Sequence, residues 1–432
     1  MSRLFADVTP LRKYRQFRRL WIGQLVSGMG SQLTIVAVSY QAYRLTHSTL
    51  VVGMIGVTQL VPLLAGAIWG GSLADAKDRR KILIGTQVAM ATASTGLVVN
   101  AALPHPQVWV LFVCSAAAAG FGGVDWPARR AALPMLVPDE DMTNAIALQT
   151  MIQQIALVVG PALAGVAIAA IGFSAVFGID VATYGVALVV ALLLPSLVPS
   201  GGGTPMGLRS MRDGFRHLKG QKLLASTYLI DLNAMIFGMP RAVFPALGTE
   251  LYGGGAGVVG LLYAAPGAGA LVGSLFTGWC AHVRHQGRAI AACVVVWGTA
   301  IALFGVVPVL WVGLALLALA GGADVISAVF RQAVQQRTVP EQLQGRLSGT
   351  FFAVVAGGPR LGDAETGVVA ELGGPQLAVW SGGLACVVGA AVILWRVPAL
   401  WRDAGGGREL TAAQEADAVA QATAELSEGE PN

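Results

Sequence analysis

Charged residues are scarce in this sequence. Only 12% of the 432 residues are charged, whereas 55% are hydrophobic, and the mean hydropathy is +0.66. A soluble core of this size cannot hold so much apolar surface. The composition therefore excludes a water-soluble globular protein and predicts a chain that lies in a lipid bilayer.

The residue patterns of common enzymes are also missing. The four cysteines show no C-x-x-C spacing, which argues against a zinc site or a disulfide framework. The five histidines match neither a metal-binding nor a catalytic-triad pattern. No G-x-x-x-x-G-K-[ST] motif is present to bind the phosphates of ATP. We therefore expect no metal, no cofactor, no ATP-driven pumping and no enzymatic activity.

The basic residues indicate membrane orientation and not nucleic acid binding. The net charge is +5, but the bases flank apolar runs instead of gathering in one patch interleaved with aromatics. Lys and Arg are retained on the cytoplasmic side of membrane proteins. With both termini on that side, 25 of the 28 bases fall inside, and only Arg44, Arg241 and Arg360 do not.

Apolar runs of about 20 residues, the length that crosses a bilayer as a helix, recur along the whole chain. The sequence predicts twelve such helices, at residues 20–43, 49–72, 82–103, 107–127, 145–171, 174–197, 224–247, 257–280, 289–307, 309–330, 347–370 and 376–399. We therefore predict an all-α integral membrane protein of the cytoplasmic membrane, with its N- and C-termini both cytoplasmic.

The two halves of the chain repeat one another at a fixed offset. Val137-Pro138-Asp139 matches Val339-Pro340-Glu341, 202 positions later, and Arg129 falls on Arg331 at the same offset. Two parallel halves related by duplication place a binding site at mid-membrane in transporters. We predict two pseudo-symmetric six-helix bundles, at 1–197 and 224–402, joined by a cytoplasmic linker with an amphipathic helix (198–223) and followed by a solvated tail (403–432).

A short charged turn, Gly71-Ser-Leu-Ala-Asp75-Ala-Lys-Asp-Arg79-Arg80-Lys81, separates the second and third apolar runs. It resembles the loop signature G-x-L-A-D-R-x-G-R-R/K of the major facilitator superfamily. It departs from the signature at Ala76 and Asp78, where the family usually has a base and a glycine. The blander alternative is an ordinary positive-inside loop.

The resemblance implies a cytoplasmic gate in which a carboxylate and bases hold the inner face shut when the cavity opens outward. The residues it assigns to this gate lie at inner helix ends: Gly71, Asp75, Arg79, Arg80, Asp125, Arg129, Arg130 and Arg331.

A second set of motifs is similar to one branch of the superfamily, which contains the bacterial enterobactin exporter and related efflux proteins. Asp125-Trp-Pro-Ala-Arg129-Arg130 and Asn144-Ala-Ile-Ala-Leu148 carry this likeness. Gly160, Pro161 and Gly165 are also similar to the G-P-x-x-G-G signature of antiporters. The resemblance implies export of small amphipathic compounds, siderophores or drugs, driven by the proton gradient.

Ionisable residues inside the apolar runs are the candidates for that chemistry, because a charge at the bilayer centre costs at least about 2.5 kcal/mol. They are Asp231, Arg241, Arg360, Asp363 and Glu365. Arg360 and Asp363 share a helix face, which allows an ion pair that a proton or an anionic substrate would break, or one that only fixes packing. Asp231 would carry protons or be a satisfied polar residue, and Arg241 would guide an anionic substrate or reach the outer headgroups.

The sequence thus predicts a proton antiporter that exports a siderophore-like or drug-like molecule by alternating access. The alternatives are a proton-coupled importer and a membrane sensor or assembly partner that has kept the fold without transport. We expect the partners to be a small-molecule substrate, protons and the lipid bilayer, with no nucleic acid, and the protein to be a monomer.

Overall fold

The computed structural model describes residues 7–198, 221–338 and 341–402, and over these ranges it contains helices and connectors but no strand. The predicted amphipathic helix of the linker and the predicted tail lie almost wholly outside the described residues. The helices of the first half are α1 (Thr9–Lys13), α2 (Arg15–Thr46), α3 (Thr49–Ala76), α4 (Arg79–Ala102), α5 (Val108–Leu136) and α6 (Asp139–Leu192).

The second half begins with α8 (Lys222–Phe237) and ends with a short helix near residue 402. Its other elements are η1 (Arg241–Val243), α9 (Phe244–Ala246), η2 (Leu247–Leu251), α10 (Gly255–Leu275), η3 (Thr277–His282), α11 (Gln286–Phe304), α12 (Leu310–Thr338), α13 (Glu341–Gly373), α14 (Pro375–Arg396) and α15 (Pro398–Arg402).

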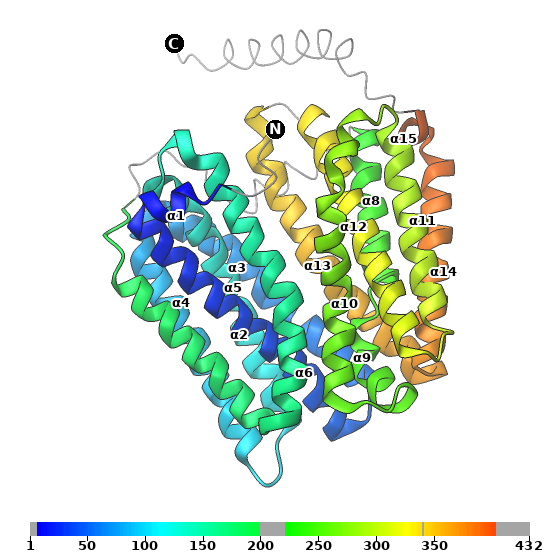
Figure 1. Ribbon diagram of the computed structural model, residues 1–432, viewed down its shortest axis with the longest axis horizontal. Helices are drawn as coiled ribbons and strands as arrows, with labels where there is room; N and C mark the ends of the chain where they lie inside the picture. Colours follow the sequence, from blue (N-terminus) through cyan, green and yellow to red (C-terminus); the bar gives the residue numbers. More distant parts are fainter. Residues whose placement is uncertain (1–6, 199–220, 339–340, 403–432) are drawn as a thin grey trace, which may run out of the picture.

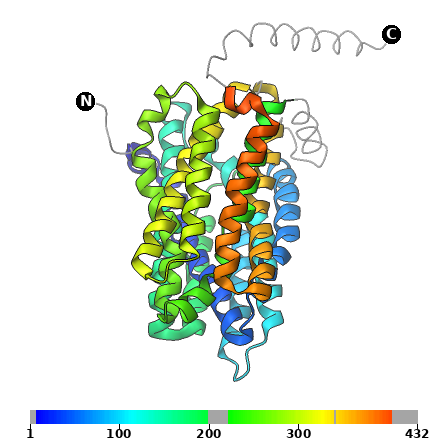
Figure 2. The ribbon, with the colours of Figure 1, turned by 90° about the vertical axis from the view of Figure 1, so that its right-hand side faces the viewer.

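The long helices form two groups that stand side by side. Figure 1 shows α1 to α6 in one group and α10, α11, α12 and α14 in the other, with α13 where the groups meet. Helix α13 packs on α3 of the first group as well as on α8 and α14 of its own. Turned by 90°, the same helices run alongside one another in the vertical direction (Figure 2).

Ten helices of the described chain are long and apolar enough to cross a membrane. One of them, α6, has 54 residues and is two helical arms that meet at Gly172, whose φ of 77° and ψ of 175° are not helical. A positive φ is accessible to glycine at little cost, so the chain reverses here without a loop. The two arms correspond to the fifth and sixth predicted spans, and α13 corresponds to the eleventh.

The seventh predicted span, 224–247, is not one continuous helix. Helix α8 ends at Phe237, and a 3-10 turn, α9 and a π-helical turn follow it. Proline has no N–H to donate and clashes with the preceding turn, so Pro240 prevents α8 from continuing, whereas Pro245 lies in the first turn of α9, where proline is tolerated. The indole Nε1 of Trp297 donates to the freed carbonyl of Gly238 at 2.9 Å, which satisfies it inside the core.

One end of the molecule holds the connectors between α2 and α3, between the arms of α6, and between α13 and α14. We call it the 47–48 end, after the His47–Ser48 connector, and the opposite end, with the Lys77–Asp78 connector, the hinge end. Two connectors at the 47–48 end are very short: two residues join α2 to α3, and Gly374 alone joins α13 to α14. The connectors 103–107, between α4 and α5, and 305–309, between α11 and α12, are longer.

The two groups of helices touch mainly in the half of the molecule nearer the 47–48 end. Helix α3 packs on α13 there, α6 packs on α10, and α2 approaches α9 and α10. Glycines allow the backbones to approach closely: Gly53 and Gly56 of α3 face the Asp363 turn of α13, and Gly367 of α13 faces Thr49 of α3.

Candidate functional site

A buried ion pair joins two helices of the second group. Arg331 of α12 places Nη2 2.9 Å from Oδ1 of Asp231 on α8, and both side chains are less than a tenth exposed. The same guanidinium lies 3.5 Å from Asp324, two turns earlier on α12. Its Nη1 donates to the hydroxyl of Ser327 at 2.9 Å. The result is a network of one cation and two carboxylates inside the helix bundle.

This geometry links two residues that the sequence placed in different roles. Asp231 was expected to carry protons, and Arg331 was expected at the cytoplasmic gate. A buried charge without a partner costs several kcal/mol, so each of these two residues offsets the cost of burying the other. Protonation of Asp231 would leave Arg331 paired with Asp324 alone, which gives the network two distinct charge states.

The expected ion pair between Arg360 and Asp363 is not formed, and that prediction was wrong. Within the described chain no ion pair of 4.0 Å or less joins them; Nη1 of Arg360 instead donates to the carbonyl of Ala356 at 2.6 Å. Three residues along a helix place two side chains on one face, but the rotamers decide whether they meet. Nε of Arg360 and Oδ1 of Asp363 are both buried without a hydrogen-bond partner.

Asp363 nevertheless sits in a positive environment at the junction of the two groups. Arg241 and Arg360 both lie close enough to attract its carboxylate electrostatically. Tyr263 of α10 donates to the carbonyl of Arg241 at 2.9 Å, which fixes the turn that follows α8. Glu365 is separate from this cluster: it is half-buried, and it accepts from the hydroxyl of Thr366 at 3.3 Å.

At the hinge end the expected gate residues fall into two groups. Asp125 and Arg129 form an ion pair one turn apart on α5, and Thr86 and Gln87 of α4 also donate to Asp125, at 2.8 and 2.9 Å. By contrast, Asp75 is half-buried and has no ion pair within 4.0 Å in the described chain.

The bases around the hinge bind backbone and ring atoms. Nε of Arg79 donates to the carbonyl of Ala74 at 3.1 Å, and Nη2 of Arg80 donates to the carbonyl of Leu192 at 2.6 Å. Arg130 is exposed and stacks on Trp126. Gly71 is buried at the end of α3. None of these four residues reaches the second group of helices through a hydrogen bond or ion pair of the described chain.

Asp78 explains why this chain departs from the signature glycine at that position. Its φ is −58°, so the backbone needs no glycine, and its side chain caps α4 by accepting from the N–H of Arg80 at 3.0 Å. It also accepts from the hydroxyl of Ser196 at 2.7 Å and from the N–H of Leu197 at 2.9 Å. The carboxylate therefore ties the end of α6 to the start of α4.

Two carboxylates that the sequence did not single out close the 47–48 end. Tyr43 of α2 donates to Glu250 of η2. Glu371 of α13 accepts from the hydroxyl of Ser48 at 2.9 Å and from the N–H of Leu50 at 3.4 Å, at the start of α3. Helix N-termini attract negative charge. Both contacts cross from one group of helices to the other, so separation of the groups at this end must break them.

The antiporter-like signature lies in contact zones of α6. Gly160 packs against Gln32 of α2, and Gly165 packs against Gly260 of α10. Pro161, between them, has its carbonyl against Gly260. Of these contacts, the one at Gly165 and Pro161 brings the two groups of helices to backbone contact, whereas Gly160 packs within the first group.

Solved structures with similar folds are membrane transporters. The nucleoside transporter NupG (D323A mutant) superposes with a TM-score of 0.71 at 12% identity, over 90% of this chain and 99% of that chain. A bacterial homologue of the iron transporter ferroportin, in an inward-facing state, superposes with a TM-score of 0.66 at 15% identity, over 88% and 98%. The fold is thus that of a multi-pass transporter.

Sequence comparisons narrow this class to a family. The family model described as transmembrane secretion effector, of the major facilitator superfamily, matches residues 5–419. The enterobactin exporter EntS of Citrobacter koseri is 29% identical over 382 residues, which cover 88% of this chain and 92% of that protein. EntS of Shigella boydii serotype 4 is 27% identical over 388 residues, 90% of this chain and 93% of that protein.

The chain therefore belongs to the transmembrane secretion effector family of the major facilitator superfamily. It is a secondary transporter of the inner membrane, and family membership shows that it is not an enzyme.

Proposed function

We propose that this protein exports a small amphipathic molecule, siderophore-like or drug-like, across the inner membrane in exchange for protons. The observation that carries the proposal is the buried ion pair between Asp231 and Arg331 in the wall of a bundle whose relatives are named exporters. A carboxylate that alternates between pairing with an arginine and holding a proton is the element that such exchange requires.

The proposal includes twelve spans, in bundles at 1–197 and 224–402, with both termini in the cytoplasm. Counting the arms of α6 separately and adding α13 supports this number. With that topology, the 47–48 end is the outer end and the hinge end is the inner one. The contacts between groups at the 47–48 end are then an outer gate in its closed position.

The substrate would reach the positively charged surroundings of Asp363 from the hinge end. Arg241 and Arg360 favour an anionic or hydrogen-bond-accepting group, and apolar side chains of α3 and α10 favour an aromatic or aliphatic body. Siderophore-like molecules combine both properties. The relatives' names point to the same class.

Everted membrane vesicles provide the test. Vesicles that contain the protein should accumulate a fluorescent amphipathic substrate or a catecholate siderophore when a proton gradient is present, and should lose it when an ionophore dissipates the gradient. Asp231→Asn and Asp363→Asn should each abolish accumulation, while Asp139→Asn, at an exposed carboxylate, should not.

Accumulation that persists without the gradient would contradict proton exchange. Uptake in right-side-out vesicles instead would make the protein an importer. Full transport by both variants would remove these carboxylates from the mechanism.

A further inference from the structure

A carboxylate lies inside the first group of helices, away from the charges described above. Asp180, on the second arm of α6, is completely buried. Within the described chain it has no ion pair, and three hydroxyl groups surround it instead. Thr34 of α2 and Ser94 of α4 each donate to Oδ2 at 2.7 Å, and Thr183 lies 3.5 Å from Oδ1.

The backbone leaves room for this carboxylate because position 30 is a glycine. A side chain on Gly30 of α2 would collide with Thr183 and with Oδ1 of Asp180. An ionised carboxylate without a cation is costly at this depth, and neutral hydroxyls offset only part of that cost. The site thus needs a cationic ligand, and a proton is the one that fits without further space.

Polar groups continue from Asp180 toward the hinge end. Residues three or four apart lie on one face of a helix, one turn of 5.4 Å along the axis. One turn from Asp180 and Thr34, Tyr184 and Ser31 are hydrogen-bonded at 3.0 Å, and Ser31 donates to the carbonyl of Ser27 at 2.8 Å.

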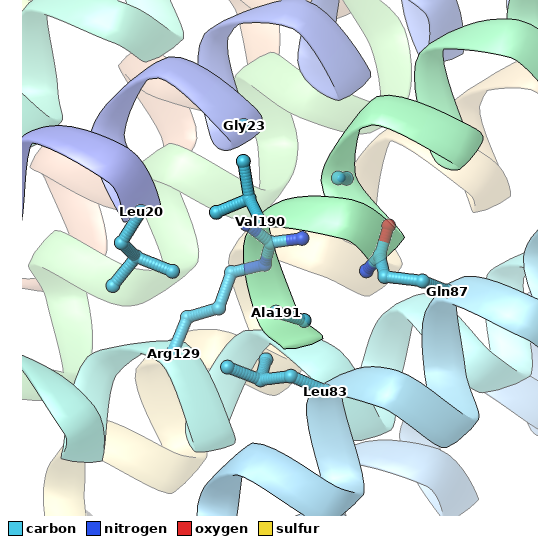
Figure 3. A pocket seen from close by; sticks show the side chains of 8 residues that line it. Leu20, Gly23, Leu83, Gln87, Arg129, Val190 and Ala191 are labelled. Carbon is cyan, nitrogen blue, oxygen red and sulfur yellow. The ribbon is translucent and has the colours of Figure 1, made fainter. Parts of the chain in front are cut away.

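One turn further lies a small cavity with room for about one water molecule. Figure 3 shows Gln87 and Arg129 at its wall, beside Val190 of α6 and Gly23 of α2. Gln87 is 1% exposed, and its Oε1 has no hydrogen-bond partner. A buried amide oxygen at a cavity of this size is the kind of group that an internal water satisfies.

The cavity ends at the ion pair of the hinge end. Arg129 lines it and pairs with Asp125, and Asp125 also accepts from Gln87 at 2.9 Å. Tyr184 lies within electrostatic range of Asp180 on one side and of Asp125 and Arg129 on the other. The named ionisable groups around Asp180 are therefore Tyr184 on its own helix and the Asp125–Arg129 pair on α5.

We propose that Asp180 is a second proton-binding site of the transport cycle, connected to the hinge end through Tyr184, Ser31 and a water molecule held by Gln87. This proposal rests on the proposed function for its role in coupling, but proton binding can be tested without transport. According to this proposal, the first group of helices binds its own proton at Asp180, apart from the Asp231–Arg331 pair of the second group.

Infrared spectroscopy of the purified, full-length protein tests the binding. The carbonyl stretch of a protonated carboxyl group should be present at neutral pH, should shift in D₂O, and should lose one component in Asp180→Asn. Removing one hydroxyl partner by Ser94→Ala should shift the frequency of that component. Ser174→Ala, which removes a different hydroxyl between α4 and α6, should leave it unchanged.

Proton transfer through Tyr184 and the coupling of Asp180 to transport are measured separately. Tyr184→Phe should slow hydrogen–deuterium exchange of the Asp180 band several-fold, and Asp180→Asn should reduce proton-driven export in everted vesicles several-fold. A wild-type spectrum without a band that Asp180→Asn removes would overturn the proposal. Sodium-dependent thermal stabilisation that Asp180→Asn abolishes would also overturn it, in favour of a sodium site.

Two further results distinguish a failure of proton binding at Asp180 from a failure of the proposed function. If Asp180→Asn does not fold, an unshifted band in Ser94→Ala overturns proton binding at Asp180. Failure of the wild type to respond to any proton gradient would instead defeat the proposed function, and the infrared band would then still report whether Asp180 binds a proton.

Discussion

Gly165 of α6 lies against Gly260 of α10, so that the two groups of helices touch backbone to backbone. A Cβ on Gly260 would lie 2.6 Å from the carbonyl oxygen of Pro161 and 2.7 Å from Cα of Gly165. Backbone atoms cannot move aside as a flexible side chain can. The contact therefore exists only because both positions lack a side chain.

The first prediction concerns this contact. Gly260→Ala should force α6 and α10 apart, at a cost of about 1–3 kcal/mol in the closed arrangement of the 47–48 end. We expect a several-fold loss of export in everted vesicles. Gly257→Ala, on the same helix with open space around it, is the matched control and should retain full activity. Equal activity of the two variants would show that the contact is not closed during the cycle.

The second prediction concerns Glu371. Glu371→Gln removes the negative charge at the start of α3, which is worth about 1 kcal/mol at an exposed helix N-terminus, or roughly a five-fold change in population. A cysteine at buried Thr49 then reports opening, in a chain whose four native cysteines have been replaced. Its labelling by a membrane-impermeant maleimide should accelerate about five-fold.

The control for this experiment is Glu140→Gln, because Glu140 is exposed at the hinge end and far from Thr49 along the molecule. An unchanged labelling rate in Glu371→Gln would mean that this carboxylate does not hold the 47–48 end closed.

The third prediction concerns the ion pair of Asp231 and Arg331. Arg331→Met leaves the buried Asp231 and the partly exposed Asp324 without their cation, which should cost about 3–5 kcal/mol of stability. Asp231→Leu leaves Arg331 paired with Asp324 and should cost less. The double variant should recover part of the loss seen in Arg331→Met, because the buried charge of Asp231 is removed with its partner and only the partly exposed Asp324 stays without a cation. Thermal unfolding of the purified protein in detergent measures all four forms. Additive losses in the double variant would argue against a direct interaction.

The fourth prediction is a pH dependence at Asp78. Burial alone would raise the pKa of this carboxyl, but hydrogen bonds from Ser196 and from the N–H groups of Leu197 and Arg80, with the charge of Lys81, lower it overall. The stabilisation is therefore fully present above the unfolded-state pKa of about 3.9 and is lost as the pH falls through the lower folded-state pKa.

Asp78→Ala should accordingly lower stability by about 1 kcal/mol at neutral pH, a typical value for a lost helix N-cap, and by much less in acid. Asp139→Ala removes an exposed carboxylate at the start of α6 and serves as the control. Melting temperatures across the acid range provide the measurement. A difference between wild type and Asp78→Ala that stayed constant with pH would contradict the assignment.

Membrane-length helices could be predicted because their signal is local. A run of apolar residues between bases indicates a span regardless of what surrounds it, and the resulting ranges overlap α2 to α5, α10, α11, α12 and α14, although α5 and α12 continue nine and eight residues past their predicted ends. The break after α8 was not predicted, although Gly238 and Pro240 are residues that commonly end a helix. The only local sequence signal for the reversal at Gly172 is the glycine itself.

The partners of buried charges could not be predicted in the same way. Arg331 pairs with Asp231, 100 positions earlier, because the rotation of α8 and α12 about their axes turns the two side chains toward each other. Arg360 and Asp363 are three positions apart and still do not pair. Sequence distance along a helix constrains the face, whereas pairing depends on packing between helices that no short pattern records.

Asp180 is a second case in which sequence patterns did not reveal the surroundings of a buried charge. Its sequence surroundings carry no base and no motif, so the sequence did not single it out. The hydroxyls that surround it come from three helices and from positions 34, 94 and 183. Each of those residues is unremarkable alone, and only their convergence distinguishes the site.

The short connectors of the 47–48 end have a consequence for how the protein meets its surroundings. The connectors of two residues between α2 and α3 and of one between α13 and α14 offer little polypeptide for a protease, an antibody or a soluble partner to bind, whereas the exposed connector 103–107 between α4 and α5 offers more. An epitope tag or reporter meant for this face therefore belongs in the connector 103–107, because either tight connector also sets the distance between two helices. Helix pairs joined so tightly can only tilt together, as stiff hairpins.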